Sequence, residues 1–236
     1  MRRLEGGPAP ARIERLAGFL RAWPAAAGTD QAASLLAEAQ LDANAAPASA
    51  APAPQPRRAG DTAIREWLVL GPWPNDPATR SGFSQLFEPE LKPVDLRTKF
   101  QVPGEAGPTR WRAMRSTTNL IDLRGEAPGS QQAVMAAACF AYARQPRRVL
   151  FEFGCDDSMD VRVNRRLIHK IGGRFKLVPR EAAVEVVLPA GWSEIMLKVG
   201  QGADGAFGFT FEACDGATGA PLEDVTFSTT PPQGLP

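Results

Sequence analysis

The sequence has few of the side chains on which most enzymatic mechanisms depend. It holds a single histidine, His169, and three cysteines, Cys139, Cys155 and Cys214, without a CxxC pair. An odd number of cysteines at these spacings argues against both a disulfide framework and a zinc knuckle. Any Ser-His-Asp, Cys-His or multi-histidine metal mechanism would have to use His169. We therefore expect no catalytic activity.

The chain also lacks an excess of either charge and any long apolar run. Its 27 basic and 26 acidic side chains leave a formal net charge of +1, whereas binding to a phosphate backbone selects a strongly basic surface. No stretch approaches the roughly 18 uninterrupted apolar residues of a membrane span, and no apolar signal-peptide core follows Arg2 and Arg3. We expect a soluble protein with no nucleic-acid partner and no membrane span, cytoplasmic by default.

Residues 1–42 are predicted to form a helical arm. Apolar residues recur at helical spacing in two segments, and Pro24 separates them. The predicted helical hairpin has apolar stripes with no partner to cover them, so we expect it to dock on a larger protein partner or complex. The candidate docking residues are Ile13, Leu16, Leu20, Leu35 and Leu36.

The arm is followed by an Ala/Pro-rich linker and then by a β domain. Residues 43–60 have the composition of an extended spacer, and residues 231–236 are predicted to be a flexible tail. Within residues 61–230 the apolar period changes from helical to alternating. Short β-rich runs bounded by turn residues cover 66–70, 149–153, 159–163, 184–188 and 207–211. This pattern predicts an all-β, antiparallel sandwich.

Two segments of the β domain have patterns of their own. Phe207, Phe209 and Phe211 alternate with small or polar residues, which places three rings on one strand face and predicts that this face is core. Residues 133–143 contain helix-forming alanines but also alternate. We assign them to a strand because their neighbours are strands.

Several motifs resemble the galactose-binding-like jelly-roll modules of large bacterial multidomain proteins. The run from Trp67 to Asn75 resembles the opening "WxxxGPFxN" of these modules, and the segments 153–157, 161–164 and 188–199 resemble their "GxDD", "VxVNG" and "LxxGWNxxLxKV" patterns. The resemblance implies a jelly-roll topology and a carbohydrate-binding role. It departs at Arg165, where the family has glycine in a type I′ turn. Arginine in a left-handed conformation costs about 1 kcal/mol, so we expect a longer or different turn.

The loop with Asp156, Asp157 and Asp160 is a candidate metal site. Its carboxylates are the oxygen ligands that calcium prefers, and related jelly-roll modules often hold a structural calcium. The alternative is a plain turn, since aspartate side chains bond their own backbone. A glycosidase pair with Glu152 is disfavoured, because adjacent residues of a strand or turn point apart.

The remaining candidate functional residues are His169, Cys139, Trp73 and Trp111. Leu167, His169 and Ile171 would share one strand face, so His169 is expected to be packed and not a catalytic base. Cys139 is read as a buried, inert thiol. Trp73 and Trp111 lie near loop-rich stretches and are candidate ligand-binding residues that could stack on a sugar or anchor a partner, and packing is the alternative for Trp73.

Two functional hypotheses follow from the sequence. The first is a non-catalytic accessory or assembly subunit, in which the sandwich is a platform and the arm docks on a larger protein. The alternative is a carbohydrate-binding module, with structural calcium as an optional stabiliser. The missing signal peptide favours the first, because most polysaccharides lie outside the cell.

Overall fold

The computed structural model describes Glu14, Ala17 and residues 60–75, 82–102, 107–127, 132–172, 176–202 and 206–232. The docking residues Ile13, Leu16, Leu20, Leu35 and Leu36 lie outside this part, as do most of the predicted linker and residues 233–236. The helical arm, the linker and the tail therefore stay predictions. No helix in the described part is long and apolar enough to cross a membrane.

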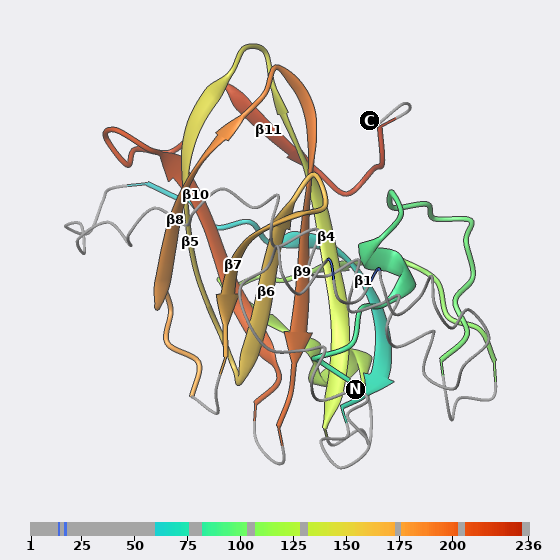
Figure 1. Cartoon of the computed structure of the whole chain (residues 1–236). Coiled ribbons are helices and arrows are strands. Elements are labelled where there is room, and N and C mark those ends of the chain that lie inside the picture. The colour runs from blue at the N-terminus through green and yellow to red at the C-terminus, as the bar shows by residue number, and fades with distance from the viewer. Residues whose placement is uncertain are drawn as a thin grey trace.

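The described residues fold into two antiparallel β-sheets (Figure 1). The larger sheet has seven strands in the order β2 (Arg112–Arg115), β1 (Glu66–Pro74), β4 (Ala133–Ala143), β9 (Gly191–Gly200), β6 (Ser158–Val163) and β7 (Arg166–Ile171), with β11 (Val225–Ser228) also paired to β4. The smaller sheet has four strands in the order β3 (Leu120–Asp122), β10 (Gly208–Asp215), β5 (Arg147–Cys155) and β8 (Ala182–Leu188). Two short 3-10 helices, η1 (Glu88–Glu90) and η2 (Leu123–Glu126), complete the described elements.

The main core lies between the inner faces of the two sheets. Trp67 from the larger sheet packs edge-on against Phe209 and Phe211 of the smaller one, with ring centroids 5.2 and 5.4 Å apart. Phe207, Phe209 and Phe211 are all buried, so the predicted core face is confirmed. Burying each ring contributes about 1.5–3 kcal/mol.

The strand assignment of residues 133–143 is confirmed, because they form β4 in the middle of the larger sheet. Every residue of β4 except Tyr142 is buried. A strand covered on both faces has no polar side, so its sequence loses the alternation that marks a half-exposed strand. This explains why its alanine-rich pattern suits a helix equally well.

The outer face of the larger sheet is partly covered by residues 82–102, which we call the strap. Phe83, Phe87 and Val94 of the strap pack with sheet residues in a second apolar cluster that includes Trp73 and Phe140. Asn75 anchors the start of the strap: its Oδ1 accepts from the backbone N–H of Phe83 (3.0 Å), and its Nδ2 donates to the carbonyl of Gln201 (2.7 Å). The sandwich therefore has a third layer over part of one face.

The hairpin between β6 and β7 corrects one prediction. The turn keeps two residues, and both are left-handed, with φ +50° at Asn164 and +65° at Arg165. The expectation of a longer or different turn is wrong. Arg165 adopts the conformation in which the related modules have glycine.

A second correction concerns the strand after this turn. His169 pairs with Val161, but Leu167 pairs with Arg162, so Ile168 is an extra residue at a bulge. Paired residues face the same side of a sheet, and a bulge reverses the alternation. His169 and Ile171 therefore face the core with Val161 and Met159, whereas Leu167 lies on the outer face.

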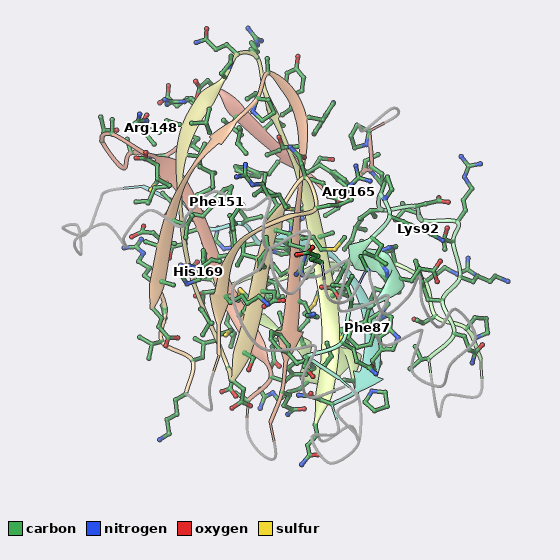
Figure 2. The ribbon with its side chains drawn as sticks, viewed as in Figure 1. Phe87, Lys92, Arg148, Phe151, Arg165 and His169 are labelled. Atoms are coloured by element: carbon green, nitrogen blue, oxygen red, sulfur yellow. The ribbon has the colours of Figure 1, made fainter. Side chains whose placement is uncertain are left out.

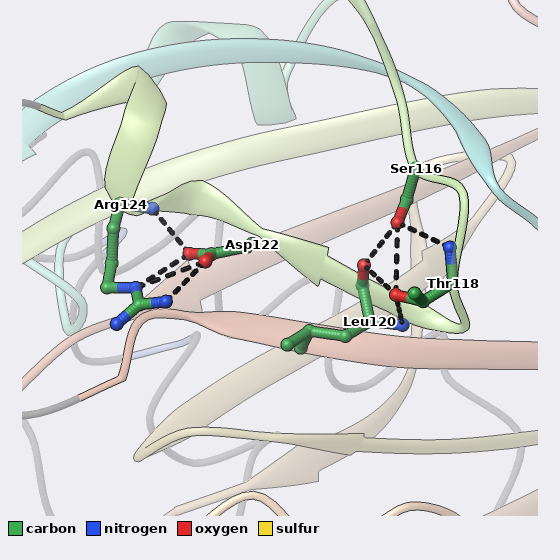
Figure 3. Close-up of polar contacts among 5 residues, drawn as sticks. All are labelled: Ser116, Thr118, Leu120, Asp122 and Arg124. Carbon is green, nitrogen blue, oxygen red and sulfur yellow. Dashed lines mark hydrogen bonds and ion pairs between the residues drawn. The ribbon is translucent and has the colours of Figure 1, made fainter.

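A short polar network shapes the passage from β2 to β3 (Figure 3). Ser116 Oγ accepts from the backbone N–H of Thr118 (3.1 Å) and donates to the carbonyl of Leu120 (2.6 Å). At the far end of β3, Asp122 accepts from the backbone N–H and the guanidinium of Arg124. These local bonds satisfy backbone groups where the chain leaves the larger sheet for the smaller one.

Candidate functional site

The two tryptophans predicted to bind a ligand are packed. Trp73 and Trp111 are only 5% and 4% exposed, and both belong to the apolar cluster beneath the strap. Trp73 packs against Phe87 with ring centroids 4.9 Å apart. Both rings are therefore packed in this conformation, as the alternative for Trp73 expects, and ligand contact by Trp73 and Trp111 stays a prediction.

The three aspartates predicted to hold calcium do not converge. Among the residues that the structure describes, no group of three His, Cys, Asp or Glu side chains is arranged to hold a metal ion. Asp157 accepts from the backbone N–H of Gly202, whereas Asp160 bonds to Arg162 Nη1 (3.2 Å) on the outer face of β6. Burial raises the pKa of Asp156, and the charge of Asp157 raises it further. Two of the three carboxylates thus bind groups of the protein itself.

His169 and the cysteines show no arrangement for nucleophilic catalysis. His169, which is labelled in Figure 2, faces the core. Its ring centroid lies 5.4 Å from that of Phe153. Burial lowers the pKa of His169 and raises that of Cys155 to about 12. Burial also raises the pKa of Cys139, so this thiol is buried as expected and stays protonated.

Two carboxylates do face each other on the outer side of the smaller sheet. Glu152 of β5 pairs directly with Glu212 of β10. Arg180 lies between them, with Nη2 2.5 Å from Glu212 and Nε 3.8 Å from Glu152. Burial alone would raise the pKa of Glu212, but hydrogen bonds from Arg180 and Thr62 lower it below its ordinary value. Since a general acid needs a raised pKa, Glu212 does not suit that role.

A surface pocket lies where the chain enters the sandwich. It has a volume of about 210 Å³, with residues 61–66 on one side and Ala213, Leu222, Phe227 and Ser228 on the other. Its charged groups are Asp61, Arg65 and Glu66; Asp61 forms an ion pair with Arg65, and Glu66 forms one with Arg115. The pocket therefore offers a small apolar wall but no uncompensated charge.

The aromatic pair Tyr142–Trp192 is the strongest candidate site. The two residues lie directly opposite each other on β4 and β9, with ring centroids 5.2 Å apart and planes inclined by 56°. Tyr142 is 37% exposed, and it is the one aromatic residue among the exposed large apolar side chains of the described part. Trp192 is half-buried, with one side packed on the cluster beneath the strap. The pair forms an aromatic surface on the outer face of the larger sheet.

Polar groups surround this aromatic pair. Thr226 of β11 lies opposite Tyr142, on the side away from Trp192. Arg144, two residues after Tyr142, is exposed and forms no ion pair with any described residue. On the other side, Asn164 of the β6–β7 turn bonds the residues after Trp192, accepting from the backbone N–H of Glu194 (2.8 Å). A hydroxyl group therefore borders the pair, and an exposed guanidinium follows Tyr142 two residues along the chain.

Sequence reasoning missed this pair. Trp192 follows Pro-Ala-Gly, a sequence that favours turn packing of the tryptophan, and Tyr142 lies in the alanine-rich strand. The rings are 50 positions apart in the sequence, and they meet only because β4 and β9 pair in one particular register. A possible signal was that Tyr142 is the chain's single tyrosine and the one polar-tipped residue of β4.

Comparisons with known proteins find no matching family model and no matching curated protein. Among solved structures, the PA14 domain of the antifreeze protein MpAFP is 12% identical, with 44% of this chain and 56% of that chain covered at a TM-score of 0.35. A β-glucosidase from Kluyveromyces marxianus in complex with glucose is 13% identical, with 47% and 15% covered and a TM-score of 0.36. The Epa9A adhesin domain from Candida glabrata, in complex with Galb1-4GlcNAc, is 14% identical, with 45% and 56% covered and a TM-score of 0.30. Likenesses this distant establish neither topology nor function, and the galactose-binding-like resemblance stays a prediction.

Proposed function

We propose that this chain is a non-catalytic binding module that holds a saccharide on the Tyr142–Trp192 pair. The observation that carries the proposal is the presence of two adjacent rings, one of them exposed, on the outer face of a sheet. A sugar ring has an apolar C–H face and a rim of hydroxyl groups. Its face can pack on an aromatic plane while its hydroxyls bond polar neighbours.

The polar border of the pair suits such a ligand. Arg144 supplies N–H donors, and Thr226 supplies a hydroxyl that can donate or accept. The rings themselves sit on paired strands of a central sheet and not on a loop, so little conformational entropy is lost when a ligand binds. The site is therefore preorganised but shallow, which is typical of modules that bind part of a longer chain.

The test is a glycan array followed by calorimetry on the best ligand. Trp192→Ala and Tyr142→Ala should each weaken binding at least tenfold, whereas Tyr142→Phe, which keeps the ring, should retain most of it. Leu120→Ala is the matched control, because Leu120 is also 37% exposed but lies on the smaller sheet. If no glycan binds, or if the ring variants bind as the parent does, the proposal is wrong.

Absence of catalysis is part of the same proposal and needs its own measurement. The bound glycan, incubated with the protein for days, should be recovered uncleaved by mass spectrometry. The carboxylates Glu152 and Glu212 are the pair to replace if cleavage is found. Loss of that cleavage in Glu212→Gln would then establish an enzyme.

The accessory-subunit hypothesis predicts a different ligand. Tyr, Trp and Arg are also the residues that most often anchor protein interfaces, so the same surface could receive a larger protein. Affinity isolation with the full chain and with a chain that begins at Asp61 separates the two predictions. A stoichiometric protein that is recovered in the absence of any glycan would favour the accessory subunit.

A further inference from the structure

The contact between the strap and the sheet contains an unusual concentration of buried charge. Five ionisable side chains at this contact are each at most 3% exposed: Glu90, Asp160, Arg162, Glu194 and Lys198. Charged residues are almost never buried to this degree unless they are paired. The cluster is therefore a specific recognition site between two parts of the chain.

Glu90 is the part of this cluster that the strap contributes. Its Oε1 lies 3.0 Å from Arg162 Nη1 and 3.1 Å from Lys198 Nζ, and its Oε2 accepts from Lys198 Nζ at 3.2 Å. Arg162 and Lys198 belong to β6 and β9, with Asp160 beside them. Asp160 lies 3.2 Å from Arg162 Nη1 and 3.5 Å from Lys198 Nζ, whereas Glu194, the sheet's other carboxylate here, accepts from the backbone N–H of Val94 (3.1 Å). The strap supplies the second carboxylate that contacts both cations.

Glu90 does not satisfy all the hydrogen-bond donors of the cations around it. Within the described part of the chain, Arg162 Nε and Nη2 are buried without a hydrogen-bond partner, and the contact between Glu90 Oε1 and Arg162 lacks hydrogen-bond geometry. Among the described residues, the guanidinium forms a hydrogen bond only with Asp160, through Nη1 at 3.2 Å. A guanidinium fork is shaped to hold a carboxylate through two parallel N–H bonds. Arg162 therefore retains capacity for a better-placed carboxylate.

Lys198 is also positioned to bind an anion. Its Nζ donates to the carbonyl of Gln85 (3.0 Å) and lies over the rings of Phe83 and Phe87, 5.1 and 5.9 Å from their centroids. All three partners belong to the strap; Phe87 is labelled in Figure 2. Moving the strap would remove Glu90 and leave Asp160 as the one carboxylate, among the described residues, that is ion-paired with Lys198 and Arg162.

We propose that Arg162 and Lys198 form a carboxylate-binding site on the outer face of the larger sheet, and that Glu90 of the strap fills it as an internal ligand. A ligand that carries a carboxylate, such as a uronic acid unit or an acidic side chain, would displace Glu90 and the strap. The displaced strap would uncover Trp73 next to the cations. The site goes beyond the saccharide surface at Tyr142 and Trp192 and does not depend on it.

Chemical rescue tests the site directly. In Glu90→Ala, the cations lack their strap carboxylate, so acetate should raise the Tm of this variant saturably and by several degrees more than sodium chloride at equal ionic strength. The parent protein and Glu88→Ala should show no such difference, because Glu88 is an exposed carboxylate paired with Lys92. Glu90→Ala combined with Arg162→Met should lose the effect. An acetate response equal to that of chloride would overturn the proposal.

A second variant covers the case in which Glu90→Ala does not fold. Glu90→Gln keeps the shape of the strap but removes its charge, so acetate should displace it. Hydrogen exchange of the backbone amides in residues 82–102 should then rise with acetate and reach a plateau, while exchange in β4 and β9 stays constant. Exchange of the strap that is independent of acetate would overturn the proposal, whatever the outcome of glycan binding at Tyr142 and Trp192.

Discussion

Arg165 is strained by the turn between β6 and β7, and its replacement by glycine should stabilise the protein. A two-residue turn of this kind requires φ > 0 at both positions, and Asn164 and Arg165 have φ +50° and +65°. Asparagine tolerates the left-handed region because its side chain can bond the local backbone. Arginine lacks the short amide side chain that eases this conformation in asparagine, and its Cβ approaches the neighbouring carbonyl.

The magnitude follows from two opposing effects. A residue with a Cβ costs about 1–2 kcal/mol in the left-handed conformation, and glycine costs about 0.5–1 kcal/mol in lost chain entropy on folding. The expected net gain is about 0.5–1 kcal/mol. Burial raises the pKa of Glu194, and the positive charge of Arg165 partly lowers it again. Any substitution of Arg165 by a neutral residue removes this electrostatic interaction. The proper reference is therefore Arg165→Ala, which loses the same charge but keeps the Cβ.

Urea unfolding followed by tryptophan fluorescence measures the difference. Arg165→Gly should exceed Arg165→Ala by about 0.5–1 kcal/mol, or a few degrees in Tm for a domain of this size. Arg166→Gly, at the first position of β7 and without a positive φ, should instead destabilise. Equal stability of the glycine and alanine variants at position 165 would refute the argument from backbone strain.

Three further perturbations have defined outcomes. Gly154→Ala should destabilise the protein by about 1–3 kcal/mol in urea unfolding, because a Cβ there would lie 1.9 Å from the carbonyl oxygen of Val178. Gly125→Ala is the control and should be nearly neutral, because a Cβ at position 125 would have no atom within 4 Å. Hydrogen bonds from Thr218 and its neighbours lower the pKa of Asp215 from 3.8 to about 2, so its contribution is complete above pH 4 and is lost as the pH falls through 2. Thermal melts should show Asp215→Asn less stable than the parent by about 1–2 kcal/mol at pH 7, with the difference closing near pH 2; a constant difference would contradict this assignment. Chelation of calcium should leave the Tm unchanged, because Asp157 and Asp160 already bind protein groups, and a fall in Tm would restore the calcium hypothesis.

The sequence alone determined the kind of secondary structure and the location of the main core. Period-two alternation placed strands at 149–153, 159–163 and 184–188, and the three alternating phenylalanines identified an inner face. Alternation reports which side of a strand is apolar, because neighbouring side chains point to opposite faces. This information is local and needs no knowledge of the partner strand.

Tertiary structure alone decided which residues are available for function. Trp73 and Trp111 look exposed in the sequence because loops surround them, yet the strap folds back over the sheet and buries them. Tyr142 contacts Trp192 only because β4 and β9 pair in one particular register. Glu90 contacts Lys198, 108 positions away in the sequence, only because the strap folds back over the sheet. Strand register and loop docking depend on contacts between segments that are distant in the sequence, so a local sequence pattern cannot predict them. The fold class could therefore be predicted from the sequence, whereas both candidate sites required the folded chain.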